Sequence, residues 1–579
     1  MIAGALTGCQ SNGLTELDRE VTAALRHNQL ETLGAGIGHD PNVVPATVTD
    51  ARPGDAAYQH TPVSNYPAAS ALPARRASAA PDAPADNQPM EREGTVTRLN
   101  LEQAVAYAIE HSREYRNRKD DLYLAAINLL IEKHLWGPRF FDTLSATATG
   151  TPESGDHDHA LQIINDLRVT KRLPYGGTVS AAAVVNFVQQ LRTASSSTAD
   201  DSQSADVVLA WSIPLLRGAG KVAQEDLIQA YRDLTYSARS FEQFRGDFLV
   251  ALARDYFSLL LVQNRIQNLE GQVKNLEWLS KRIEALANAG REPFFEVQRS
   301  QQEVLFARND LLREREAYEA ALDAFQVRLG MPTTQKLELV PAMIEVPLPA
   351  AGVKESVKTA WDFRLDLQTA LNQIDDSRRK VEVARNQLLP DLDLTGNVTL
   401  RTNTDKKRGG VDLDLGSSSY TAGVTYGAPL DRKVEALQHR SALVALEQSE
   451  RSYTLLRDQI ANEVKASIRE IELANFTLDL QTRNLELAQK RRDGVVLRLR
   501  TLGPRDFIEA EDDLRQALDR RDAAVRDLRV SVLQYLLRTG QMRVSADGKW
   551  QPPGKLMDTD PPQQPPAANH VMGAREKAS

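Results

Sequence analysis

The chain has 579 residues, and its 70 lysines and arginines against 78 aspartates and glutamates give a net charge of −8. This balance argues against a nucleic acid partner, because nucleic-acid-binding proteins usually carry a basic surface. The single cysteine, Cys9, excludes a disulfide framework and a multi-cysteine metal site. The most apolar run, FLVALARDYFSLLLV, contains Arg254 and Asp255, whereas a transmembrane helix needs about 20 largely uncharged residues. The protein therefore either lies outside membranes or crosses one as strands, whose sequence signal is weaker.

The first nine residues, MIAGALTGC, end in a stretch that resembles a bacterial lipobox, in which the cysteine is acylated after cleavage. We interpret residues 1–9 as a truncated signal segment, because only eight residues precede Cys9 and a signal peptide needs a longer apolar stretch. On this reading Cys9 carries the lipid. The alternative is a chance cysteine in a disordered end.

Both ends of the chain have compositions typical of disorder. Residues 10–94 are polar and rich in alanine and proline, and residues 546–579 are rich in proline. Such segments bury too little apolar surface to fold. We expect a flexible tether at residues 10–94 and a disordered tail at residues 546–579.

An internal repeat occupies the region between these ends. Residues 95–340 and 341–545 each read as a helical arm, alternating strands, a very long helix, a glycine break and a shorter helix. The arms end near Pro138 and Pro390. Period-two alternation predicts four strands within about residues 140–215 and two within about residues 391–430.

The long helices are predicted from heptad periodicity. Stepping alternately by four and three from Leu227 to Ala287 meets apolar residues at most positions, as coiled-coil packing requires. A looser version of the pattern runs from Tyr453 to Ile471. A helix of about 70 residues extends about 105 Å, which is too long for an ordinary globular domain.

This order of elements, together with motifs such as ARNQLLPDLDL, resembles the TolC family of bacterial outer-membrane efflux proteins over residues 99–542. The resemblance implies a mostly α-helical fold with a β-barrel segment. It implies a homotrimer whose helices form a periplasmic tunnel and whose strands pool into one barrel in outer-membrane lipid. An additional hairpin near KRLPYGG departs from the family pattern. It predicts six strands per chain where the family has four, and hence about 18 rather than 12 in the barrel.

The function that the resemblance implies is passive conduction across the outer membrane. Such a channel receives substrates from a periplasmic adaptor protein and an inner-membrane pump, in an efflux or type I-like export system. The alternatives are a periplasmic adaptor protein and a soluble coiled-coil scaffold. Both would have long helices, but neither needs strand pairs between the helices of each repeat.

Two similar breaks interrupt the long helices: AGREPFFEV at residues 289–297 and LGPRDFIEAEDD at residues 502–513. We expect Gly290 and Gly503 to adopt backbone conformations that are costly for other residues. The resemblance places both breaks at the periplasmic tips. It therefore implies that Gly290, Arg291, Gly503 and Arg505 contact the adaptor.

Acidic residues follow the second break at helical spacing. Glu509 and Asp512 are three residues apart, so they share a helix face, where like charges repel. The resemblance implies that both acids line the pore aperture, with Glu296 in the matching position of the first repeat. Around a threefold axis, rings of carboxylates attract cations. The alternative is a solvated helix start whose acids favour the helix dipole.

No other motif indicates chemistry. GDHDHA contains His157 and His159, which we interpret as part of a polar external loop rather than a metal site. No glycine-rich phosphate loop follows a strand, and no nucleophile has a recognisable base beside it. We therefore expect no enzymatic activity, no cofactor and no bound metal.

Overall fold

The structure is a computed structural model of the full chain. It describes residues 10–33, 96–153, 156–192, 202–340, 352–402, 413–498, 503–544 and 550–551. Within these ranges, no helix combines the length and apolar character that crossing a bilayer requires.

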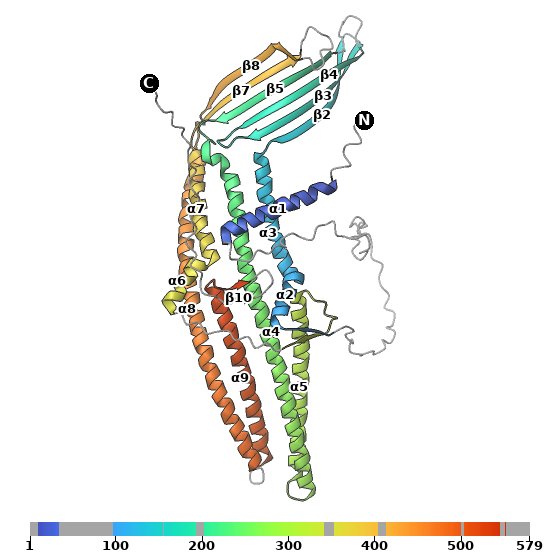
Figure 1. Ribbon diagram of the computed structural model, residues 1–579, viewed down its shortest axis with the longest axis vertical. Coiled ribbons are helices and arrows are strands. Elements are labelled where there is room, and N and C mark those ends of the chain that lie inside the picture. Colours follow the sequence, from blue (N-terminus) through green and yellow to red (C-terminus); the bar gives the residue numbers. More distant parts are fainter. Residues whose placement is uncertain are drawn as a thin grey trace, which may run out of the picture.

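The molecule has two parts, a curved sheet at one end and a set of long helices that extend from it (Figure 1). The first half of the chain contains β1 (Thr97–Leu99), α2 (Leu101–His111), α3 (Arg113–Trp136), β2 (Arg139–Glu153), β3 (Asp156–Arg172), β4 (Thr178–Arg192), β5 (Ser202–Pro214), a 3-10 turn (Gly220–Gln224), α4 (Glu225–Asn288) and α5 (Phe294–Leu329). The second half contains β6 (Leu337–Leu339), α6 (Val353–Phe363), α7 (Leu365–Asn386), β7 (Asp391–Thr402), β8 (Leu413–Gly427), α8 (Lys433–Leu497), α9 (Pro504–Arg538), β9 (Arg543–Val544) and β10 (Trp550–Gln551).

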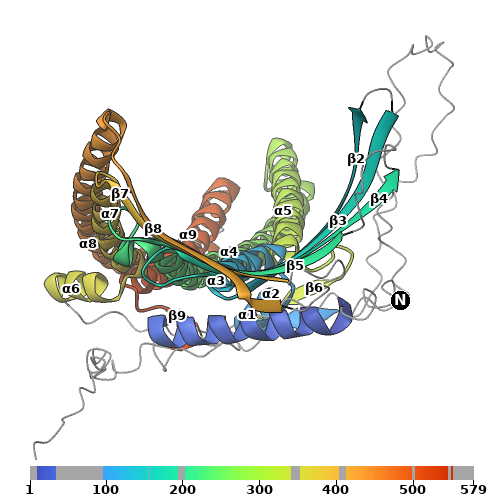
Figure 2. The ribbon, with the colours of Figure 1, turned by 90° about the horizontal axis from the view of Figure 1, so that it is seen from above.

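The six long strands form one antiparallel sheet in the order β2-β3-β4-β5-β7-β8. The expected four strands in the first half and two in the second are confirmed. The two sets join through the pairing of β5 with β7, in which Trp211 lies opposite Gly396. Seen from the end, the sheet is curved and open, so that β2 and β8 are its two edges (Figure 2).

The additional hairpin is anchored at its turn to the start of α4. The Gln224 side-chain amide donates to the carbonyl of Pro174 at 2.7 Å, and the Gly220 N–H donates to the carbonyl of Tyr175 at 2.8 Å. These bonds join the β3–β4 turn to the segment that links β5 to α4. The hairpin is thus an integral part of the sheet-to-helix junction.

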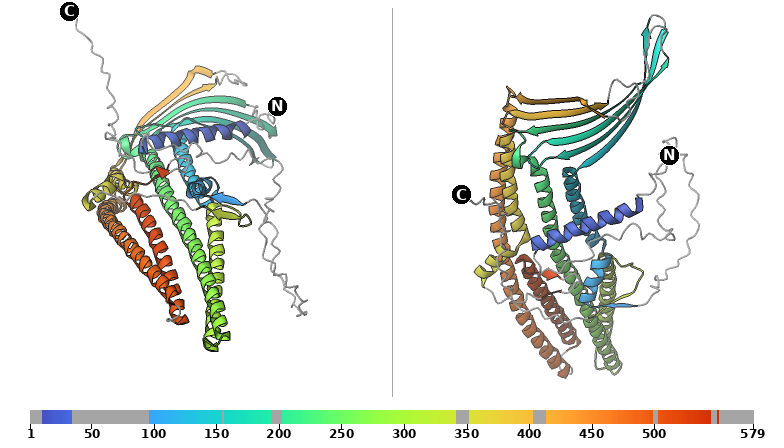
Figure 3. Two further views of the ribbon diagram at one scale, coloured as in Figure 1. Left: turned by 60° about the horizontal axis from the view of Figure 1, so that its bottom comes forward. Right: turned by 45° about the horizontal axis from the view of Figure 1, so that its top comes forward.

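The two longest helices, α4 with 64 residues and α8 with 65, confirm the heptad prediction. Helix α4 pairs with α5 and α8 pairs with α9, so that each half ends in a helical hairpin, and α9 also packs against α4 (Figure 3). At the predicted apolar positions, Leu234, Leu252 and Ile283 of α4 and Ile460 and Val464 of α8 are buried.

The main core lies where α2, α3, α4 and the end of α9 meet. Tyr115 packs against the rings of Phe241 and Phe248, each with ring centroids 5.7 Å apart. Aromatic side chains bury large apolar areas, so this cluster contributes much of the hydrophobic stabilisation. It holds the α2–α3 junction against α4.

The prediction of a disordered tether was wrong for residues 10–33. They form helix α1 (Gln10–Leu33), which crosses α3 and α4. The physical reason is an apolar pair at four-residue spacing, Val21 and Leu25, which are 3% and 2% exposed. The composition of the whole segment conceals this short stripe. Residues 1–9, 34–94 and 552–579 lie outside the described residues.

The prediction that His157 and His159 belong to a polar external loop was also wrong. Both belong to strand β3, where His157 lies opposite Pro152 and His159 opposite Gly150, rather than to a loop. Within the described residues, no group of three or more His, Cys, Asp or Glu residues is placed to hold a metal ion.

Candidate pore entrance and helix tips

The tips of the two helical hairpins lie at the end of the molecule opposite the sheet (Figure 1). Gly290 ends the first hairpin's long helix with φ at +68°, a left-handed conformation that favours glycine. The backbone conformation predicted for Gly290 is confirmed. Arg291 N–H then donates to the carbonyl of Leu286 at 2.9 Å, which closes the helix end.

Gly503 does not behave as expected. Its φ of −74° and ψ of 167° are ordinary extended backbone that any residue adopts. The prediction of a special conformation was wrong, because Gly503 is the N-cap of α9 and not the C-terminal residue of α8. Its N–H donates to the Asp506 carboxylate at 3.0 Å, and Pro504 begins the helix. Proline and an acidic residue in the first turn are sufficient to start α9.

The acids after this cap have arginine partners within the same chain. Arg491 of α8 donates to Glu509 at 2.9 Å and also forms an ion pair with Asp513. The hydrogen bond to Glu509 and the charge of Asp513 together raise the pKa of Arg491. Asp512 accepts hydrogen bonds from Arg515 and Gln516, each at 2.7 Å. The side chains of Glu509 and Asp512 are 57% and 44% exposed, so these pairs remain in contact with solvent.

Glu509 and Asp512 border a charged cavity of about 420 Å³ between α4, α5 and α9. Its lining residues come from all three helices and include three arginines and four acids: Arg299, Arg505, Arg515, Glu303, Asp310, Glu509 and Asp512. Glu509, Asp512 and Arg505 therefore come together at one cavity within the chain. Glu296, half-buried near the other tip, does not border this cavity.

The arginines that pair with Glu509 and Asp512 were not predicted from the sequence. Arg515 could have been found, because it lies three residues after Asp512 on the same helix face. Arg491 could not have been found, because it belongs to α8 and meets Glu509 only through the pairing of the two helices.

An aromatic pair at the first tip was also not predicted from the sequence. Phe294 and Phe295 are 69% and 62% exposed.

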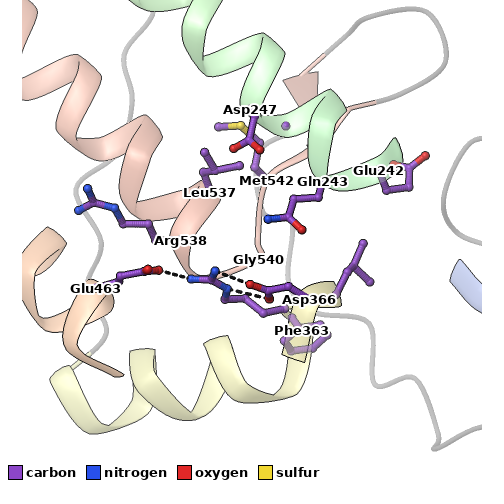
Figure 4. Close-up of a pocket in the computed structure, with 13 residues that line it drawn as sticks. Glu242, Gln243, Asp247, Phe363, Asp366, Glu463, Leu537, Arg538, Gly540 and Met542 are labelled. Carbon is purple, nitrogen blue, oxygen red and sulfur yellow. Dashed lines mark hydrogen bonds and ion pairs between the residues drawn. The ribbon is translucent and has the colours of Figure 1, made fainter. Parts of the chain in front are cut away.

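A second cavity, of about 330 Å³, lies at mid-height between α4, α8, α9 and the α6–α7 junction (Figure 4). Its central feature is Arg364, which donates to Asp366 at 2.6 and 3.0 Å and to Glu463 at 2.5 Å. Burial by itself lowers the pKa of Arg364. Asp366 and Glu463 more than offset this effect, so the pKa of Arg364 is raised. The arrangement joins the helix junction to α8, which is a structural role.

Comparison with known proteins agrees with this architecture. Residues 357–532 match the model of the family described as outer membrane efflux protein. No curated protein sequence matches the chain.

Solved structures match over most of the chain. The outer-membrane channel OprN matches with a TM-score of 0.58 and 16% identity, covering 76% of this chain and 90% of its own. The outer membrane protein VceC from Vibrio cholerae matches with a TM-score of 0.57 and 14% identity, covering 76% and 96%. The Campylobacter jejuni CmeC outer membrane channel matches with a TM-score of 0.54 and 14% identity, covering 76% and 85%. The chain therefore has the fold of these channels, and residues 357–532 are similar to the outer membrane efflux protein family.

Proposed function

We propose that this chain is one subunit of a homotrimeric channel, a passive and non-enzymatic conduit for substrates delivered by a periplasmic adaptor and an inner-membrane pump. The observation that carries the proposal is the six-stranded sheet with two free edges, β2 and β8, placed at one end of two long helical hairpins. An unpaired edge is a row of unsatisfied backbone groups. Pairing β2 of one copy with β8 of the next closes the sheet without any edge.

Exposed apolar side chains along the helices also favour self-assembly. On α5 they include Leu305, Phe306 and Leu312, and on α8 they include Leu473, Phe476 and Leu480, all more than half exposed. Apolar stripes of this length on a single chain indicate an interface. A second copy is the occupant that also satisfies the sheet edges. The rival readings, an adaptor protein and a soluble scaffold, do not account for the sheet.

Six strands from each of three copies make a barrel of 18 strands rather than 12. Barrel diameter grows roughly in proportion to strand number, so its lumen is wider than that of a 12-stranded barrel. Electron cryomicroscopy of the detergent-extracted protein tests both the number of chains and the number of strands. We expect three chains and 18 strands. A monomer, or sheets that close within one chain, contradicts the proposal.

For the aperture, we propose that Glu509 and Asp512, with Glu296 near the other tip, line the periplasmic entrance. Glu509→Gln with Asp512→Asn should lower cation preference, measured as the reversal potential in a planar bilayer under a salt gradient. The observed ion pairs add an opposite test. Arg491→Gln removes the cation beside Glu509 and Asp513, and it should raise cation preference. Unchanged reversal potentials in both variants favour the solvated-helix reading.

We also propose that the tips bind the adaptor through Gly290, Arg291, Gly503 and Arg505. Gly503 has ordinary backbone angles, and among the described residues only Asp506 lies as near as 4.0 Å to an added Cβ. Gly503→Val should therefore change the tip surface and leave the fold intact. We expect reduced efflux with normal assembly. Full efflux at normal protein level contradicts this assignment.

Lipidation of Cys9, which lies outside the described residues, remains a proposal based on the sequence. Two acyl chains are sufficient for stable membrane attachment. Mass spectrometry of the N-terminal peptide from membrane-extracted protein should find a diacylated cysteine. An unmodified Cys9 in protein made with its natural N-terminus contradicts the proposal.

A further inference from the structure

Helix α1 lies across the helical wall on the convex side of the curved sheet (Figure 2). Its contacts are ordered along its length. Near its C-terminal end, Asn28 donates to Thr235 of α4 at 3.0 Å. Ten residues earlier, Asp18 accepts a hydrogen bond from Tyr123 of α3. The helix therefore crosses α4 first and α3 second when followed from its C-terminus to its N-terminus.

The N-terminal part of α1 continues past α3. In two views it extends beyond α3 on the side of the β2 edge, beneath β2 and β3 (Figures 1 and 3). The apolar stripe of the helix continues in the same direction. Val21 and Leu25 are buried against this chain, whereas Leu17, four residues before Val21, is 54% exposed. The stripe thus extends further than the surface its own chain offers.

In the proposed trimer, a second copy of the chain lies on this side. α3 leads directly into β2, and β8 leads directly into α8. Pairing β2 with β8 of a second copy therefore brings that copy's α8 beside α3. The start of α8 offers matching apolar surface, since Val434 and Leu437 are 62% and 61% exposed.

We propose that α1 is an arm that reaches across the subunit boundary, with Leu17 lying on the first turns of α8 in a second copy. The inference rests on the proposed trimer. It assigns residues 10–33 a role in assembly that an N-terminal tether would not have.

Photo-crosslinking in the full-length protein tests the arm. A benzoylphenylalanine residue at position 17, in outer membranes, should give an ultraviolet-dependent adduct between two chains. Its fragment should map to the first turns of α8. The matched control is benzoylphenylalanine at Ala23, which is exposed on the opposite face of α1 and should give no such adduct.

A stability measurement gives a second readout. Leu17→Asp should lower the temperature at which the heated trimer separates into single chains on a gel, whereas Ala23→Asp should leave it unchanged. If the wild type is trimeric but position 17 gives only adducts within one chain or with lipid, the arm is wrong and the trimer stands. If native mass spectrometry finds no trimer in the wild type, the proposed function and the arm both fail.

Discussion

Gly330 lies directly against the carbonyl of His111, so close that a Cβ on Gly330 would stand 2.2 Å from that oxygen. Gly330 ends α5 with φ at +79°, and His111 ends α2 where the chain turns into α3. The second half repeats the contact. Gly540, just after α9, has φ at +70°, and its Cβ would stand 3.0 Å from the Phe363 carbonyl at the α6–α7 junction.

Gly330→Ala is therefore expected to destabilise the helical region. A left-handed conformation costs a non-glycine residue roughly 1–2 kcal/mol, and relieving the contact requires the α2–α3 junction to move. The matched control is Gly290→Ala, which has a similar φ of +68° but no atom of the described part of the chain within 4 Å of the added Cβ. Thermal unfolding followed by circular dichroism should show the larger loss for Gly330→Ala. Equal losses would show that the close contact carries no additional cost.

Gly396 tests the junction of the two strand sets. A Cβ at this position would lie 2.2 Å from the Trp211 ring on the paired strand. Gly396→Val should therefore disrupt β5–β7 pairing and reduce the amount of folded protein, judged by heat-dependent migration on a gel. Gly423→Val in β8, whose nearest neighbour is 4.0 Å away, is the control and should fold normally. A normal yield of Gly396→Val would mean that Trp211 moves aside at little cost.

Asp522 gives a prediction that depends on pH. Its side chain is 10% exposed at the contact between α9 and α4. Burial raises the pKa of Asp522, while the charge of Arg521 opposes the shift. A carboxyl with a raised folded-state pKa stabilises the fold when protonated. That contribution is present below the unfolded value of about 3.9 and is lost as pH rises through the folded pKa.

Asp522→Asn should consequently raise the thermal midpoint at pH 7.5, because a neutral amide replaces a buried charge. The gain should shrink as pH falls toward 4. Asp527→Asn, five residues further along α9 at a side chain that is 56% exposed, is the control and should change little at either pH. A gain from Asp522→Asn that is the same at both pH values would exclude the titration of this carboxyl as its cause.

Phe294 and Phe295 test the first helix tip. Both are more than half exposed at the turn between α4 and α5, where an apolar pair has no role in this chain's own core. Because aromatic residues are enriched at interface hot spots, replacing both with serine should weaken adaptor binding by at least tenfold in a titration with the purified partner. Val327→Ser, at a 63% exposed position near the other end of α5, is the control. An unchanged affinity would leave the arginines and glycines of the tips as the remaining candidates.

The sequence by itself determined the long helices and the six long strands. Heptad spacing from Leu227 to Ala287 and alternation through residues 140–215 and 391–430 predicted α4 and the strands, because these periods repeat over many residues and belong to the backbone geometry itself. The break at Gly290 was also readable, since a left-handed helix end favours glycine.

Only the tertiary structure decided which side chains meet. Residues 10–33 look disordered by composition, and they fold as α1 because α3 and α4 offer a surface for Val21 and Leu25. Glu509 has no arginine partner until the pairing of α8 with α9 brings Arg491 beside it. Contacts between residues on different helices depend on the distance between the helices and on their rotation about their own axes. The local sequence determines neither quantity, so the pairing of Glu509 with Arg491 became visible only in the folded chain.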